Sequence, residues 1–155
     1  TTVGAPAIPA LDGRHDQAMS FANRVVRRVL ESPAHRLLSA STCVIRYRGR
    51  RSGATFSTPT QYADHGDGLV IFVGRPDTKS WWRNFRDDHD LDVLVAGNWR
   101  SMVGRAIVGA EEPDTITPLL DAYLQRFPKV AKQLGPAGSG TGRDGAIVVW
   151  CRPRR

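Results

Sequence analysis

The sequence predicts an α+β domain in which short antiparallel strands form a barrel or sandwich with flanking helices. Six apolar runs of strand length are separated by turn residues, and two segments with helical spacing interrupt them. The chain has 155 residues, of which 41% are hydrophobic, enough to bury one sizeable core. We therefore expect a single domain over residues 15–155, after a flexible tail at residues 1–14 whose small residues, prolines and glycines show no period.

The first periodic segment runs from about residue 16 to residue 30. Apolar side chains recur there at helical spacing with arginines between them, which predicts an amphipathic basic helix that ends before Pro33. A short second segment follows at residues 34–40. We expect the helix to pack its apolar stripe on the domain core. The alternative is peripheral contact with an anionic membrane.

The strand-like runs follow in quick succession, at residues 42–47, 58–62, 69–73, 91–95, 99–108 and 147–150. Residues 64–68 contain two glycines and two aspartates, which predicts a hairpin turn between the second and third runs. Ala96, Gly97 and Asn98 predict another hairpin turn between the fourth and fifth runs.

Two helical segments interrupt these strands. Residues 80–87 are short and aromatic, and residues 115–125, extending to about residue 134, place leucines and aromatic rings on one face. Asp114 is the predicted N-cap of this second helix and Gly135 its stop. We expect the helix to cover one end of the barrel. The five glycines of residues 135–145 predict a flexible loop near a ligand opening.

Charge and cysteine content restrict the function classes. The formal net charge is +7 and all but three of the 22 basic residues are arginine, so we expect an anionic partner: nucleic acid, an acidic membrane or a phosphorylated cofactor. Cys43 and Cys151 lie in apolar runs without metal-ligand spacing, which predicts buried free thiols, a cytoplasmic setting and no metal. The sequence contains no nucleotide-binding glycine motif and no recognisable hydrolase triad.

An arginine-rich turn follows the first strand-like run, where residues 46–53 include four arginines within six residues. Glycine lets backbone N–H groups converge and arginine adds planar forks for phosphate or carboxylate, so the turn is a candidate anion cradle. The alternative is a solvated turn whose arginines only keep the surface wet. Arg46 and Arg48 alternate with Ile45 and Tyr47, so we expect these two arginines to face solvent.

A second basic and aromatic stretch spans residues 73–85. Gly74 at a strand end allows a flat ligand close to the backbone, Lys79 precedes a helix start, and Trp81 or Trp82 offers an apolar wall. The alternative makes the tryptophans core anchors and Asn84 a local capping or turn residue.

Taken in order, these stretches resemble the deazaflavin-dependent nitroreductase family of actinobacteria, which comprises flavin and deazaflavin oxidoreductases. The resemblance covers roughly residues 44–153 and is carried by Gly49-Arg50-Arg51-Ser52-Gly53, then Thr58-Pro59, then Lys79 with Trp81-Trp82-Arg83-Asn84-Phe85, then residues 146–153. It implies a split β-barrel, mostly antiparallel and similar to FMN-binding proteins, with flanking helices. It also implies that the barrel binds the deazaflavin coenzyme F420.

The same resemblance implies where the cofactor binds. The phosphate and polyglutamate tail of F420 would meet the arginine-rich turn, and the ring would lie along the end of the third strand-like run. The residues implied to bind the cofactor are Arg50, Arg51, Ser52, Gly53, Thr58, Pro59, Val73, Gly74, Arg75, Lys79, Trp82 and Asn84.

We therefore expect an F420-dependent reductase that transfers a hydride to a hydrophobic quinone-like, unsaturated carbonyl or nitro substrate. The tyrosines that nitroimidazole-reducing members carry after the late helix have no counterpart here, because this chain has Phe127, Val130 and Leu134. Nitroimidazole is thus the least favoured of these substrates. No catalytic side chain is identified, and the candidate proton donors are Tyr62, Tyr123, Ser101 and water.

Two other function classes remain open. One is a non-catalytic carrier or storage protein that holds F420, haem or a fatty acid in the barrel. The other is nucleic-acid binding, which we do not expect because aromatic residues are not interleaved with the basic turn. Between cofactors we expect F420 in preference to FMN, and we expect a monomer or a homodimer.

Overall fold

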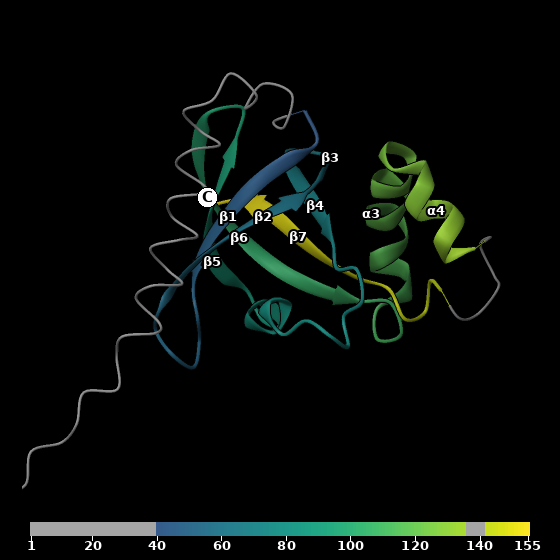
Figure 1. Cartoon of the computed structure of the whole chain (residues 1–155), viewed down its shortest axis with the longest axis horizontal. Helices are drawn as coiled ribbons and strands as arrows, with labels where there is room; N and C mark the ends of the chain where they lie inside the picture. The colour runs from purple at the N-terminus through teal and green to yellow at the C-terminus, as the bar shows by residue number, and fades with distance from the viewer. Residues whose placement is uncertain (1–39, 136–141) are drawn as a thin grey trace, which may run out of the picture.

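The computed structural model describes residues 40–135 and 142–155 (Figure 1). Within them, seven strands form one antiparallel sheet in the order β2-β1-β5-β6-β7-β4-β3. The strands are β1 (Thr42–Arg48), β2 (Thr55–Gln61), β3 (Ala63–His65), β4 (Gly68–Phe72), β5 (His89–Val95), β6 (Asn98–Val108) and β7 (Ile147–Pro153). The helices of the described part are a 3-10 helix, η1 (Trp81–Phe85), and two α-helices, α3 (Pro113–Arg126) and α4 (Pro128–Leu134).

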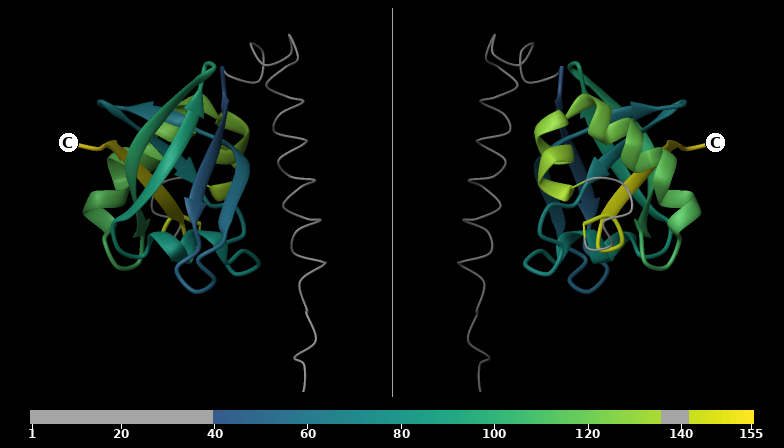
Figure 2. Two further views of the ribbon diagram at one scale, coloured as in Figure 1. Left: turned by 90° about the vertical axis from the view of Figure 1, so that its left-hand side faces the viewer. Right: turned by 90° about the vertical axis from the view of Figure 1, so that its right-hand side faces the viewer.

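The sheet curls back on itself at Tyr62. β2 and β3 lie at opposite ends of the strand order, yet Tyr62 alone separates them in the sequence. One residue spans only about 3.3–3.6 Å, so the two edges of the sheet must approach each other at this corner. Figure 2 shows the curled sheet from two sides. The predicted α+β class and the mostly antiparallel split β-barrel with flanking helices are confirmed.

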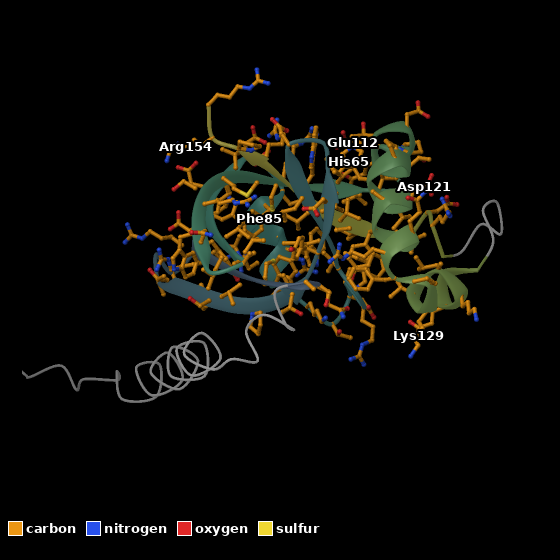
Figure 3. The ribbon with its side chains drawn as sticks, turned by 90° about the horizontal axis from the view of Figure 1, so that it is seen from above. His65, Phe85, Glu112, Asp121, Lys129 and Arg154 are labelled. Atoms are coloured by element: carbon orange, nitrogen blue, oxygen red, sulfur yellow. The ribbon has the colours of Figure 1, made fainter. Side chains whose placement is uncertain are left out.

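Side chains from alternate strand positions fill the barrel. On β1, Ile45 and Tyr47 are buried whereas Arg46 and Arg48 are exposed, as their alternation predicts. Phe85 of η1 is fully buried inside the barrel (Figure 3), and its ring meets that of Tyr47 edge-on with the centroids 5.2 Å apart. This contact anchors η1 in the core.

Both cysteines belong to this core, as predicted. Cys43 and Cys151 are free and almost completely buried. Burial raises the pKa of Cys43 to about 12 and also raises the pKa of Cys151. Each thiol therefore stays protonated at neutral pH and acts as a small apolar side chain rather than as a nucleophile.

A second core lies between α3 and the outer face of the sheet. Val70 of β4, Ile107 of β6 and Val148 of β7 form an apolar patch there, and α3 covers it with Ile116, Leu119, Leu120, Tyr123 and Leu124. Figure 1 shows α3 and α4 together on one side of the sheet. The prediction that this helix covers one end of the barrel is therefore wrong, because the outward side chains of these strands supply the surface that it buries.

The ends of the helices differ from the expected ones. Glu112 rather than Asp114 is the N-cap, because Pro113 takes the first helical position, where its missing N–H costs no hydrogen bond. Asp114 lies in the first turn, where a carboxylate favours the positive end of the helix. A break before Pro128 divides the predicted segment into α3 and α4. Gly135, with a φ of 76°, ends α4 as predicted.

The second predicted strand-like run, at residues 58–62, has other bounds in the structure, and the short strand β3 after it was not predicted. β2 begins earlier than expected, at Thr55, and the chain turns at Tyr62 into β3. The hairpin turn predicted for residues 64–68 is shorter, because β3 and β4 pair up to His65 and Gly68 and leave a two-residue turn. The predicted tail, the segments at residues 16–30 and 34–39, and residues 136–141 of the glycine-rich loop lie outside the described residues. In the part that is described, no helix is long and apolar enough to cross a membrane.

Gly104 of β6 offers a test of the packing inside the barrel. A Cβ atom at this position would lie 2.9 Å from Cδ1 of Phe85 and 3.2 Å from Cδ2 of Leu91. Because Phe85 is fully buried, it has little room to move. Gly104→Ala should lower the free energy of unfolding by about 1–3 kcal/mol, measured by urea denaturation.

Gly74→Ala is the matched control. A Cβ atom there would meet only Cε1 of Phe72, at 3.9 Å, which is ordinary van der Waals contact. The free energy of unfolding of this variant should be within about 0.5 kcal/mol of that of the wild type. An equal loss of stability in the two variants would contradict the packing described for Phe85.

Candidate functional site

The turn between β1 and β2 is closed by its own backbone. The Gly49 N–H donates to the Ala54 carbonyl and the Gly53 N–H donates to the Gly49 carbonyl, each at 2.8 Å. Gly53 has a φ of 66°, which glycine adopts without strain. The Ala54 N–H also donates to Oγ of Ser52, at 3.2 Å. These bonds hold the arginine-rich turn in one conformation.

Side-chain hydrogen bonds fix η1 on the other side of the site. Trp82 is buried and its indole N–H donates to the Pro76 carbonyl at 3.1 Å, so this tryptophan is a core anchor. Asn84 donates from Nδ2 to the Trp81 carbonyl at 2.8 Å and accepts the Arg50 N–H on Oδ1 at 2.9 Å. Asn84 thus forms a local side-chain hydrogen bond within η1 and links this helix to the turn.

Arg50 joins these two segments. Its Nε donates to the Asn84 carbonyl at 2.6 Å, and its Nη2 donates to the carbonyls of Asp87 and Asp88 at 3.2 and 3.0 Å. The acceptors lie 34–38 residues away in the sequence. Figure 2 shows the turn and η1 at the same end of the curled sheet. The guanidinium of Arg50 is therefore engaged by the protein itself.

An open hollow of about 410 Å³ lies between the turn and η1. Phe56 of β2 contributes an exposed ring, which stacks on Tyr47 with the centroids 5.7 Å apart. The hollow is lined by Gly49, Arg50, Arg51, Ser52, Phe56, Ser80, Arg83 and Asn84. Of the residues implied by the resemblance, it brings together Arg50, Arg51, Ser52 and Asn84, and Gly53 belongs to the same turn.

Phe56, Ser80 and Arg83 line the hollow although they were not predicted as site residues. The available signal was the position of Arg83 inside the quoted motif, directly before Asn84. Alternation along β2 gives a second signal. Phe56 pairs with Tyr47, whose side chain points into the barrel, so an aromatic ring was to be expected on the inner face.

The hollow has an excess of positive charge. Arg51 and Arg83 are exposed and form no ion pair with any residue of the described ranges, and no carboxylate lines the hollow. Elsewhere in those ranges many arginines are neutralised, in the pairs Arg46–Asp92, Arg86–Glu111, Arg105–Glu112, Arg143–Asp121, Arg152–Asp88 and Arg154–Asp90. Two unpaired guanidinium groups facing one hollow favour an anionic ligand.

The remaining predicted residues lie outside this lining. Thr58 of β2 pairs with Ile45, so its side chain is on the inner face, whereas Pro59 pairs with Val44 on the other face. Val73 is buried and donates its N–H to the Ile147 carbonyl at 2.9 Å. Three further predicted residues lie on the loop between β4 and η1: Gly74, Arg75 and Lys79.

Arg75 has an unusual backbone conformation for a residue other than glycine, with a φ of 51°. Its carbonyl accepts two hydrogen bonds from Thr78, at 3.1 Å from the N–H and 2.9 Å from Oγ1. Backbone conformations of this kind are concentrated at ligand-binding segments. The loop between β4 and η1 thus has one strained backbone position, at Arg75, and it reaches the hollow at Ser80.

The three side chains considered as proton donors do not line the hollow. Tyr62 lies in the barrel core, and Tyr123 lies in the second core, where burial raises its pKa to about 12. Ser101 of β6 is exposed and donates to Oδ1 of Asp92 at 3.0 Å. Within the described ranges, no group of three or more His, Cys, Asp or Glu side chains is arranged to hold a metal ion.

Similarity to known proteins identifies the family of this chain. Residues 20–149 match the family model described as F420H(2)-dependent quinone reductase. The chain belongs to this family. The resemblance to deazaflavin-dependent enzymes is thereby confirmed, and membership makes the chain an F420H2-dependent reductase. No curated protein sequence matched the chain significantly.

Solved structures support the fold of this F420H2-dependent reductase. One, described as a domain-swapped dimer, has a TM-score of 0.55 at 14% sequence identity and covers 90% of this chain and 99% of its own. Another, described as the F420-H2 dependent reductase FDR-A, has a TM-score of 0.55 at 14% identity and covers 71% of this chain and 93% of its own. Both show that the curled sheet of this chain is a known architecture.

The link between η1 and the turn predicts the effect of removing Asn84. Asn84→Ala loses the acceptor of the Arg50 N–H and the donor to the Trp81 carbonyl. The free energy of unfolding should fall by about 1–3 kcal/mol, and the Arg50 amide should exchange with solvent faster in hydrogen-exchange measurements.

Asn98→Ala is the control for this change. Asn98 also donates from Nδ2 to a backbone carbonyl, that of Ala96 at 3.2 Å, but in an exposed turn away from the hollow. It should leave the exchange of the Arg50 amide unchanged. Unaltered exchange in Asn84→Ala would show that the two segments are held together by other means.

Proposed function

We propose that this reductase binds F420 with its anionic tail in the hollow between the arginine-rich turn and η1, and passes a hydride to a hydrophobic quinone-like or unsaturated carbonyl acceptor. The observation that carries the proposal is a hollow lined by Arg51 and Arg83, neither of which has an ion-pair partner among the described residues, and by no carboxylate of the described part of the chain. F420 has a phosphate and a polyglutamate tail, so it supplies the negative charge that this hollow favours. The family of the chain supplies the identity of the cofactor.

The residues of the turn and of the following loop fit two parts of such a cofactor. Ser52 and Gly53 present a hydroxyl group and a fixed backbone beside the tail. We propose that Thr58, on the inner face of β2, extends this wall, while Pro59 lies on the other face of the strand. Val73, Gly74 and Arg75 directly follow β4, and we propose that the ring lies along them. Gly74 suits this role, because neither packing nor its backbone angle requires a glycine there.

The chain binds and orients, and the cofactor supplies the chemistry. Reduced F420 provides a hydride, so no side chain of the chain has to act as a nucleophile. This agrees with the protonated and buried state of Cys43 and Cys151. Lys79 lies on the exposed loop that leads to η1, where its charge adds to the attraction for an anionic ligand. Trp82 and Asn84 hold η1 in place beside the hollow.

The acceptor is proposed to be apolar because of the exposed ring of Phe56 at the mouth of the barrel, which is 40% accessible. Nitroimidazole is a less favoured acceptor. Phe127, Val130 and Leu134 stand where nitroimidazole-reducing members carry tyrosines, and here they pack partly buried against the second core. A carrier function for haem or a fatty acid is disfavoured because side chains such as Phe85, Ile71 and Val149 fill the barrel.

A fluorescence titration with F420 and FMN side by side tests the cofactor. We expect the protein to quench F420 fluorescence at micromolar concentration and to bind FMN more weakly. Absence of F420 binding at these concentrations would refute the proposal. Gly74→Ala should fold normally yet bind F420 less tightly, because the new methyl group would occupy the space proposed for the ring.

Turnover separates a reductase from a carrier. When menadione or cyclohexenone is added together with the protein, reduced F420 should be oxidised. The oxidation is measured as the return of F420 absorbance. Tight binding without detectable oxidation by either acceptor would instead support a non-catalytic carrier of the cofactor.

A further inference from the structure

We infer that Arg83 and Arg51 are the residues that contact the anionic tail of the ligand, and that Arg50 is a positioning residue that holds the two contacting arginines in place. This inference rests on the proposed function and refines it, because it assigns different roles to three arginines around one hollow. It also adds Arg83, which the resemblance does not name as a cofactor-binding residue.

Arg50 is less free to bind an anion than Arg51 or Arg83, because its Nε and Nη2 are already engaged and only Nη1 has no hydrogen-bond partner among the described residues. Its guanidinium already donates to three backbone carbonyls, those of Asn84, Asp87 and Asp88. Turning it toward a ligand would leave these carbonyls without their donors and would release the end of η1 from the turn. What Arg50 provides is the fixed distance between the two sides of the hollow.

Arg83 lies between two residues whose side chains form hydrogen bonds within the protein. Its neighbours on both sides are fixed, Trp82 by the bond to the Pro76 carbonyl and Asn84 by the bonds to Trp81 and Arg50. The Arg83 guanidinium lies 5.6 Å from the centre of the Trp82 ring and has no carboxylate partner among the described residues. It therefore presents an unpaired charge to the hollow.

Arg51 faces the same hollow from the opposite segment. It lies in the turn that the backbone hydrogen bonds of Gly49, Gly53 and Ala54 close. Two planar guanidinium groups from separate elements can engage different oxygens of one phosphate or of adjacent carboxylates. The chemistry recognised is a phosphate ester or a multiply charged carboxylate chain, and not the neutral ring.

The test compares two ligands and three single variants. F420 and a deazaflavin nucleoside that lacks the phosphate and glutamate tail are titrated by fluorescence against the wild type, Arg83→Ala, Arg51→Ala and Arg86→Ala. Arg86 is the matched control, because it is next to the same helix but is paired with Glu111 at 2.9 Å and does not line the hollow.

Arg83→Ala and Arg51→Ala should each weaken F420 binding about tenfold and leave binding of the tail-less nucleoside unchanged. Arg86→Ala should bind both ligands like the wild type. If Arg83→Ala binds F420 as tightly as Arg86→Ala does, the inference is wrong, while F420 binding by the wild type keeps the proposed function intact. If the wild type does not bind F420, the proposed function fails.

In that last case, inorganic pyrophosphate decides the inference by itself. Its addition should shift the amide and guanidinium NMR signals of Arg51 and Arg83 in the wild type, whereas the amide signals of residues 51 and 83 should not shift in the variant that carries both Arg51→Ala and Arg83→Ala. Absence of the wild-type shifts would overturn the inference. Arg50→Lys tests the positioning role, because lysine keeps the charge but cannot bond three carbonyls in the same fork. This variant should bind both F420 and the nucleoside more weakly, and hydrogen exchange of its Asn84 amide should be faster. Binding and exchange equal to those of the wild type would refute the positioning role.

Discussion

The guanidinium of Arg50 holds together the part of the molecule on which the proposed site depends. It connects the turn between β1 and β2 to the carbonyls at the end of η1 and just beyond it. Behind it, the ring of Tyr47 contacts Phe85 inside the barrel and Phe56 at the mouth. Through these contacts the lining of the hollow is connected to the core of the barrel.

Closure of the sheet places these parts at one end of the molecule. Because the chain passes from β2 to β3 at Tyr62, the sheet must curl, and the barrel then has an interior that receives Phe85. α3 packs on the outer face of the sheet instead. Six of the other described arginines form ion pairs with carboxylates, whereas the two at the hollow do not.

Much of the fold could be predicted from the sequence, because strand alternation and turn residues are local signals. The outward positions of Arg46 and Arg48, the buried thiols and the stop at Gly135 followed from such signals. The corner at Tyr62 and the strand β3 after it could not be predicted in this way, because they result from closure of the sheet. The position of α3 depends likewise on which outer strand face is left apolar.

The candidate site was likewise only partly predictable from the sequence. The resemblance indicated the turn and the η1 segment, but sequence alone could not distinguish Arg50 from Arg51. Their roles differ because only one of them reaches carbonyls more than 30 residues away. The most direct measurement is a crystal structure with F420 bound. We predict phosphate or carboxylate oxygens on Arg51 and Arg83 with the Arg50 bonds intact; a tail bound by Arg50, with those bonds broken, would contradict the account.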